Sequence, residues 1–208
     1  MSFPSRRRSS LYATVLLAFA LWFITFYLSW GIFWIKISFS AALLAAVSLL
    51  LQPDRKRQFR FSLRSIGIGL LSAGALYLIF WMGKRISSIL FPFADRQIGG
   101  IYGIGEGIPM WAIGLLLFFV TGPGEEIYWR GYLQEQLMMR HGRWKGWLFA
   151  ASAYAVVHIW SFNFMLIGAA AVAGLFWGAM YRRFGTLAPV IVSHSVWSCV
   201  IFAVFPMR

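Results

Sequence analysis

The stretch GPGEEIYWRG at residues 122–131 directly follows the apolar segment at residues 111–120 and places two carboxylates and an arginine beside it. A purely hydrophobic membrane span would contain none of these charged groups. An ionisable side chain at bilayer depth costs on the order of 3 kcal/mol or more, so such residues usually serve a function. Glu125 and Glu126 are a third of the six acidic residues in the chain, which makes this stretch the first candidate site.

The composition of the chain is that of an integral membrane protein. Of its 208 residues, 60% are hydrophobic and only 12% are charged, whereas soluble domains contain roughly 25% charged residues. The net charge of +13 comes from Lys and Arg in short clusters between apolar runs, which argues against nucleic-acid binding. A single cysteine, Cys199, excludes an intramolecular disulfide.

The apolar runs predict an all-α, polytopic bundle of about seven transmembrane helices. The first run is long enough to cross about 30 Å of hydrocarbon and is too long for a signal peptide, so we expect it to be retained. We expect Lys36 to interrupt the apolar sequence after this first run, and residues 91–107 to form an interfacial loop. The predicted spans are residues 11–35, 37–51, 65–83, a helix that begins at 108 and contains the opening stretch, 147–160, 164–181 and 189–205.

The basic clusters predict the orientation of these spans. Clusters at residues 6–8, 55–64, 140–145 and 182–183 share one side when the N-terminus is cytoplasmic. The positive-inside rule therefore favours a cytoplasmic N-terminus and a C-terminus on the opposite side. We divide the chain into a basic tail at 1–10 and one membrane domain at 11–208. A GxxxG sequence at 174–178 predicts close helix packing inside the bundle.

Spacing within the opening stretch gives its two acids different expected roles. Gly122-Pro123-Gly124 should break the helix, and Pro123 should then start a new helix with both acids at its positive end. Glu126 and Arg130 are four residues apart and are predicted to pair on one face. Glu125 is rotated about 100° from that face, which leaves it as the freer base.

Histidines supply the remaining polar groups inside the predicted spans. His158 has Tyr154 one turn before it on the same helix face, and His194 has Ser198 one turn after it. His141 falls in a basic loop, where we expect it to be solvated or to face lipid headgroups. The two intramembrane histidines and the glutamate pair lie on three different predicted helices, and we expect all of them at similar depth.

A carboxylate with two imidazoles allows two kinds of chemistry. Glu125 and His158 can deprotonate a water that attacks a carbonyl, while His194 and Ser198 donate to the resulting oxyanion. Alternatively, Glu125, His158 and His194 can hold a zinc ion whose bound water is the nucleophile. The sequence contains neither HExxH nor a cysteine cluster, and residue spacing leaves both routes open.

This ordered set of residues resembles the CAAX prenyl protease and bacteriocin-processing (CPBP, or Abi) family of intramembrane endopeptidases, which includes the Ras-converting endopeptidase. The resemblance is carried by the EExxxRG sequence at 125–131, by an aromatic residue four positions before His158 and by His194 in a late helix. It covers residues 108–205, the expected catalytic core. It implies a helical membrane enzyme that hydrolyses a peptide bond in a membrane-associated protein or peptide.

The resemblance also implies a role for each matching residue. Glu125 and His158 would activate water, His194 would help to stabilise the oxyanion, and Glu126 and Arg130 would support the site. This glutamate mechanism requires no cofactor, and the zinc route stays as the alternative. We expect a bacterial cytoplasmic membrane as the location, and the lipid bilayer and a peptide substrate as partners.

Two positions depart from the family pattern. The family usually has Phe at the position of Tyr154, and Asn or Asp at the position of Ser198. A hydroxyl is shorter than an amide, and the loss of one oxyanion donor typically costs about 100-fold in rate. Two other functions therefore stay open: a non-catalytic immunity or regulatory protein that keeps the protease scaffold, and a proton-coupled transporter that uses Glu125 and Glu126.

Overall fold

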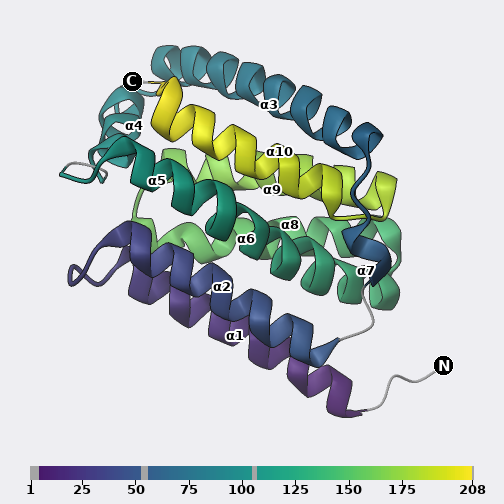
Figure 1. Cartoon of the computed structure of the whole chain (residues 1–208). Helices are drawn as coiled ribbons and strands as arrows, with labels where there is room; N and C mark the ends of the chain where they lie inside the picture. Colours follow the sequence, from purple (N-terminus) through teal and green to yellow (C-terminus); the bar gives the residue numbers. More distant parts are fainter. Residues whose placement is uncertain (1–4, 53–55, 105–106, 208) are drawn as a thin grey trace.

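A computed structural model describes residues 5–52, 56–104 and 107–207, and every regular element in these ranges is helical. The helices lie side by side in one bundle (Figure 1). The principal helices are α1 (Ser5–Phe26), α2 (Phe33–Leu51), α3 (Leu63–Leu90), α4 (Ala94–Gly103), α5 (Met110–Leu116), α6 (Gly122–Tyr128), α7 (Glu135–His141), α8 (Arg143–Val157), α9 (Phe164–Phe184) and α10 (Ala188–Cys199). The predicted all-α class is confirmed.

Several helices are long and apolar enough to cross a membrane. Within the described residues, four helices meet this description: Phe33–Leu51, Leu63–Leu90, the continuous helix Met110–His141, and Phe164–Phe184. Ser10–Phe26 and Ala188–Val204 are shorter apolar helices. The chain is therefore a polytopic helical membrane protein, and the count of seven spans stays a prediction.

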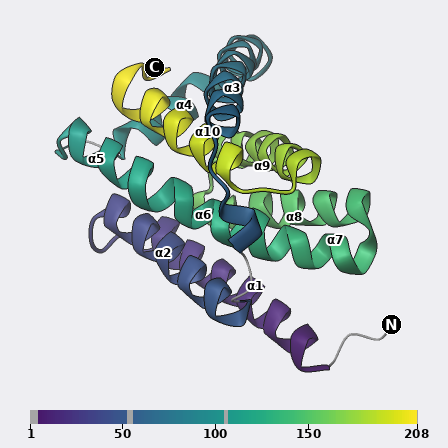
Figure 2. The same ribbon diagram turned by 45° about the vertical axis from the view of Figure 1, so that its right-hand side comes forward.

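Helix α6 lies in the middle of the bundle. Helices α1 and α2 form the expected hairpin along one side, and α10 lies along α3 on the opposite side (Figures 1 and 2). Helix α6 packs between α2 and α10. The start of α1 and the end of α10 lie at opposite ends of the bundle (Figure 1).

The hairpin turns earlier than the sequence predicts. Helix α1 ends at Phe26, and Gly31 takes a left-handed φ of 72° in the turn before α2. Lys36 lies inside α2, where its Nζ donates to the carbonyls of Ile24 (3.2 Å) and Leu28 (2.6 Å). These carbonyls are at the end of α1, where backbone acceptors lack helical partners. The predictions of one helix over 11–35 and of an interruption at Lys36 are therefore wrong.

The connection between α3 and α5 is also more helical than predicted. Ser62 and Ser65 form a capping box that starts α3, and the helix continues through residues 84–85 to Leu90. Arg85 lies over the Trp81 ring at 5.4 Å, so its charge does not end the helix. Most of the predicted loop at 91–107 is α4, while residues 105–106 lie outside the described ranges.

Two predicted basic segments fall partly outside the described residues. Within the tail predicted at 1–10, residues 1–4 are not described, and Ser5 begins α1. Within the basic cluster at 55–64, residue 55 is not described, and Lys56–Phe59 form a short 3₁₀ helix. The structure therefore does not describe every residue of these two predicted cytoplasmic segments.

The central helix does not break at Gly122-Pro123-Gly124. Residues Met110–His141 are one helix in which α6 is flanked by two π-helical turns, Leu117–Thr121 and Trp129–Gln134. Proline normally clashes with the carbonyl four residues before it and cannot donate a hydrogen bond. In the wider π turn, Gly122 N–H bonds the Leu117 carbonyl five residues earlier, so the helix continues past Pro123. The predicted placement of the acids at a helix N-terminus is wrong.

Two glycines of this stretch allow close backbone contact on different sides of α6. A Cβ atom at Gly122 would lie 2.6 Å from Ser195 Oγ of α10, and one at Gly124 would lie 3.0 Å from the backbone carbonyl of Ala41 in α2. Any larger residue would push these helices apart. The glycines therefore position the glutamates rather than end the helix.

Three other sequence predictions are confirmed. The turn at residues 161–163 separates α8 from α9, with Phe162 at a left-handed φ of 48° and Asn163 capping α9. Pro189 lies in the first turn of α10. In the GxxxG sequence, Gly174 approaches α8 at Tyr154, so this pattern serves packing within the bundle.

Candidate active site

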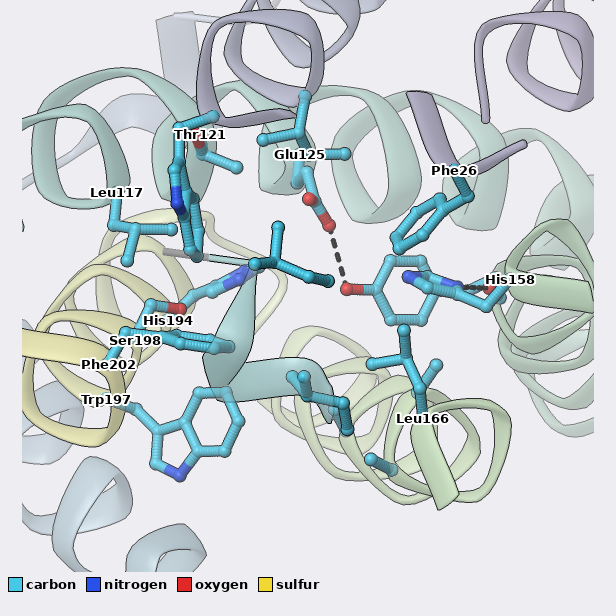
Figure 3. Close-up of a pocket in the computed structure, with 18 of the residues that line it drawn as sticks. Phe26, Leu117, Thr121, Glu125, His158, Leu166, His194, Trp197, Ser198 and Phe202 are labelled. Atoms are coloured by element: carbon cyan, nitrogen blue, oxygen red, sulfur yellow. Dashed lines mark hydrogen bonds between the residues drawn. The ribbon is translucent and has the colours of Figure 1, made fainter. Parts of the chain in front are cut away.

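Five predicted site residues line one cavity of about 130 Å³ in the bundle: Glu125, Tyr154, His158, His194 and Ser198. Figure 3 shows Glu125 between His158 on one side and His194 with Ser198 on the other. A buried water needs roughly 10–15 Å³ by the same measure, so several waters fit. Apolar side chains line most of the remaining wall: Phe26, Phe33, Trp34, Ile37, Phe80, Leu117, Leu166, Trp197 and Phe202.

Glu125 is held by one neighbour and has one free oxygen. Its side chain is 5% exposed, and Oε2 accepts a 2.8 Å hydrogen bond from the Tyr154 hydroxyl (dashed line in Figure 3). No donor among the described residues reaches Oε1. The hydroxyl that distinguishes Tyr154 from the usual family Phe therefore orients the carboxylate and leaves one oxygen for a water.

His158 is bound at both ring nitrogens. Nδ1 lies 2.8 Å from the Tyr154 carbonyl, and Nε2 lies 3.3 Å from Trp22 Nε1. An indole N–H can only donate, so Nε2 is the acceptor and Nδ1 carries the proton given to the carbonyl. Glu125 and His158 line the same cavity but are not hydrogen-bonded to each other in the described structure. Their predicted joint action on a water stays a prediction.

Glu126 is shared by two partners. Its Oε1 lies 2.8 Å from Arg130 Nη1, which confirms the predicted ion pair, and 2.6 Å from His194 Nδ1. Glu126 is fully buried, and Oε2 has no hydrogen-bond partner among the described residues. The sequence did not predict that His194 contacts Glu126. This contact joins α10 to α6 and orients the His194 ring.

Aromatic rings complete the surroundings of these charged groups. Trp177 stacks on the His194 ring with centroids 3.8 Å apart and an angle of 17°. The Arg130 guanidinium lies over the rings of Tyr154 (4.6 Å) and Trp177 (5.5 Å). The aromatic faces offer the cation a favourable electrostatic environment inside the bundle. Trp177 and Trp22 were both missed from the sequence, because a tryptophan among eleven in apolar runs carries no spacing signal.

The arrangement does not fit the zinc alternative. Among the described residues, no three His, Cys, Asp or Glu side chains lie close enough together to hold a metal ion. His158 already uses both ring nitrogens, and His194 uses Nδ1 on Glu126. Zinc binding at His158 Nε2 would require its contact with Trp22 to break, whereas the contacts at Nδ1 of both histidines could remain. We therefore derive no chemical step through a metal.

His141 lies away from this cavity, as predicted. It is the last residue of α7, it is exposed, and its ring packs edge-on against Phe149 at 5.3 Å. His158 and His194 line the cavity, and His141 lies outside it.

Removing the Tyr154 hydroxyl tests its hold on Glu125. We expect Tyr154→Phe to fold normally and to lower the kcat for peptide-bond cleavage roughly tenfold, because a hydrogen bond to a charged group contributes about 1.5–3 kcal/mol and 1.4 kcal/mol is tenfold in rate. Steady-state kinetics on purified protein would measure the change. Tyr27→Phe, at a 55% exposed position outside the cavity, is the control. Equal kcat in the two variants would show that the hydroxyl does not orient Glu125.

Comparison with known families identifies part of the chain. The family model described as type II CAAX prenyl endopeptidase Rce1-like matches residues 107–200. This range contains every residue predicted for the site. No curated protein and no solved structure matched the chain. Residues 107–200 are therefore a domain of the Rce1-like type II CAAX prenyl endopeptidase (CPBP/Abi) family.

Proposed function

We propose that the protein is an intramembrane endopeptidase that hydrolyses a peptide bond in a membrane-associated protein or peptide. One observation carries the proposal: a carboxylate, two imidazoles and a hydroxyl from three helical elements converge on one largely apolar cavity. Apolar walls exclude bulk water and strengthen electrostatic interactions inside the cavity. The family membership of residues 107–200 supports the same reaction class.

The catalytic step follows from the free oxygen of Glu125. A water donates to Glu125 Oε1 and to an acceptor at His158, gives its proton to the carboxylate, and adds as hydroxide to the carbonyl carbon of the substrate. The oxyanion that forms accepts hydrogen bonds from Ser198 Oγ and from Nε2–H of the charged form of His194. Glu125 then passes the proton to the amide nitrogen as the C–N bond breaks, which yields one carboxylic acid and one amine.

Glu126 and Arg130 act on this step indirectly. Glu126 Oε1 receives His194 Nδ1 at 2.6 Å, so it fixes which ring nitrogen of His194 faces the cavity. Arg130 balances the Glu126 charge at 2.8 Å and contacts the Tyr154 ring. In this assignment Glu125, His158, His194 and Ser198 contact reacting atoms, and the other two position them.

The predicted membrane topology belongs to the same proposal. The alternating helix directions in Figure 1 support about seven spans, and the basic clusters support a cytoplasmic N-terminus. The bacterial cytoplasmic membrane is part of the same proposal. The hydrocarbon-facing surface of α3, with exposed Leu70, Leu71, Leu78 and Ile79, suits a lipid environment.

The test compares protein termini in membranes of cells that express the wild-type chain or His158→Ala. We expect new N- and C-termini of one membrane-associated protein or peptide in the wild-type membranes and their loss in the variant, because the acceptor for the attacking water is gone. His141→Ala should keep the cleavage, because His141 lies outside the cavity. The readout is mass spectrometry of terminal peptides. Identical termini in all three membranes would reject the protease and favour the non-catalytic alternative.

A further inference from the structure

Trp22 lies beside His158 although it is far away in the sequence. It belongs to α1, which precedes the matched family domain at residues 107–200. Its side chain is fully buried, and Nε1 donates to His158 Nε2 at 3.3 Å. The indole ring meets the imidazole edge-on, with centroids 5.9 Å apart and an angle of 77°.

The contact decides the chemical form of the imidazole. An indole has a donor and no acceptor, so a hydrogen bond from Trp22 requires an unprotonated Nε2 on His158. Nδ1 then keeps its hydrogen and donates to the Tyr154 carbonyl at 2.8 Å. The two contacts hold the ring between α1 and the backbone of α8. They select one of two neutral tautomers and disfavour the charged ring, whose Nε2–H would face the indole N–H.

The selected tautomer is the one that a water-activating site requires. A water that donates to the ring needs the lone pair of Nε2 directed to the cavity, and general base catalysis contributes roughly 10²–10⁴-fold. At 3.3 Å the bond from Trp22 is at the long end of the range for hydrogen bonds. In this structure the Nε2 lone pair accepts from Trp22, so a water that donates to Nε2 must displace this long hydrogen bond.

We propose that Trp22 is a positioning residue for the reaction, fixing His158 as the neutral tautomer with Nε2 as acceptor. The proposal rests on the proposed role of His158. It makes the N-terminal helix part of the active unit, although the family match begins at residue 107. Phe26 of the same helix lines the cavity and packs 5.5 Å from the His158 ring, so α1 contributes to the wall as well as to the hydrogen bond.

Trp160 offers a matched control on the same side of the bundle. It packs against Phe19 and Phe23 of α1, with ring centroids at 5.0 and 4.8 Å. Its Nε1 is buried and has no hydrogen-bond partner among the described residues. Trp160→Phe therefore removes an indole from the contact with α1 without removing a hydrogen bond. Trp22→Phe removes an indole and the donor to His158 together.

The first measurement is independent of any substrate. Protein labelled with ¹⁵N in histidine and tryptophan is placed in lipid nanodiscs, and His158→Ala assigns the His158 signals. We expect an unprotonated Nε2, a protonated Nδ1 and a scalar coupling between Trp22 Nε1 and His158 Nε2 across the hydrogen bond. In Trp22→Phe the coupling should be lost and the Nε2 signal should shift, while Nδ1 stays protonated through its bond to the Tyr154 carbonyl; Trp160→Phe should keep the wild-type signals. Absence of the coupling in the wild-type protein would overturn the proposal, even if no variant folds.

The second measurement uses a substrate identified through the comparison of termini. We expect Trp22→Phe to lower kcat roughly tenfold or more at unchanged KM, within the range of general base catalysis, and Trp160→Phe to keep the wild-type kcat. Equal kcat for the two variants would overturn the positioning role. A wild-type protein without proteolysis would reject the proposed function, whereas the coupling would still report whether Trp22 holds His158.

Discussion

Replacing Glu125 with Gln should reduce peptide-bond cleavage at least about 1,000-fold, because an amide cannot take the proton of the attacking water and general base catalysis contributes roughly 10²–10⁴-fold. The fold should survive, since the amide oxygen can still accept the hydrogen bond that Tyr154 gives to Oε2 at 2.8 Å. Single-turnover kinetics with purified protein would measure the loss, and thermal unfolding would show that the variant is folded.

Glu135→Gln is the matched control for this substitution. Glu135 also accepts a hydrogen bond from a tyrosine, with Tyr181 Oη at 3.0 Å from its Oε2, but it does not line the cavity. The two variants therefore make the same chemical change in the same type of contact. We expect the Glu135 variant to cleave at nearly the wild-type rate. Full activity in the Glu125 variant would remove Glu125 from the mechanism and leave the water without its base.

The second large effect is expected on stability. Glu126 and Arg130 are 0% and 2% exposed, and Nη1 lies 2.8 Å from Oε1. Breaking such a buried pair from one side typically costs about 3–5 kcal/mol, because the remaining charge is left buried without its partner. We expect this loss in the free energy of unfolding for Glu126→Met and for Arg130→Met, measured by denaturant titration in detergent micelles.

The double variant provides the internal control. Glu126→Met with Arg130→Met removes both charges of the pair, a replacement that is often neutral for buried pairs, although His194 Nδ1 still loses its contact with Glu126. Its loss of stability should therefore be smaller than the sum of the single losses, which a double-mutant cycle measures. Glu135→Met, which removes a partly exposed carboxylate, should cost less than either single variant. Strict additivity would show that the buried ion pair does not stabilise the bundle.

Local parts of the site could be predicted because short spacing on one helix determines them. The pair Glu126 and Arg130 and the shared face of Tyr154 and His158 both follow from a separation of four residues. The structure confirms the ion pair and places the two aromatic rings 5.1 Å apart. The turn at residues 161–163 was predicted because a long uncharged run had to be divided.

Contacts between distant helices could not be predicted in the same way. The bond from Trp22 to His158 spans 136 positions, and that from His194 to Glu126 spans 68. No local pattern encodes the rotation of one helix about its axis against another. The sequence could show that these groups are polar and at similar depth, but not which of them touch.

Two errors in the helix boundaries have separate physical causes. The turn after Phe26 contains no charged residue, so the charge pattern did not predict it, although Gly31 is a turn signal. The helix through Pro123 continued because a π-helical turn precedes it, and such turns have no clear sequence signature. In both cases the residue types suggested one helix boundary, whereas backbone hydrogen bonding determined a different one.

The two glycines of α6 also have a mechanical meaning. At Gly122 the backbone of α6 packs directly against Ser195 of α10, and at Gly124 it packs against the backbone of Ala41 in α2. A bilayer that thins or thickens tilts helices, and a tilt of α6 must be transmitted to both neighbours. We therefore expect the close packing of α6 against α10 to resist changes in the separation of Glu125 and His194 when the membrane deforms.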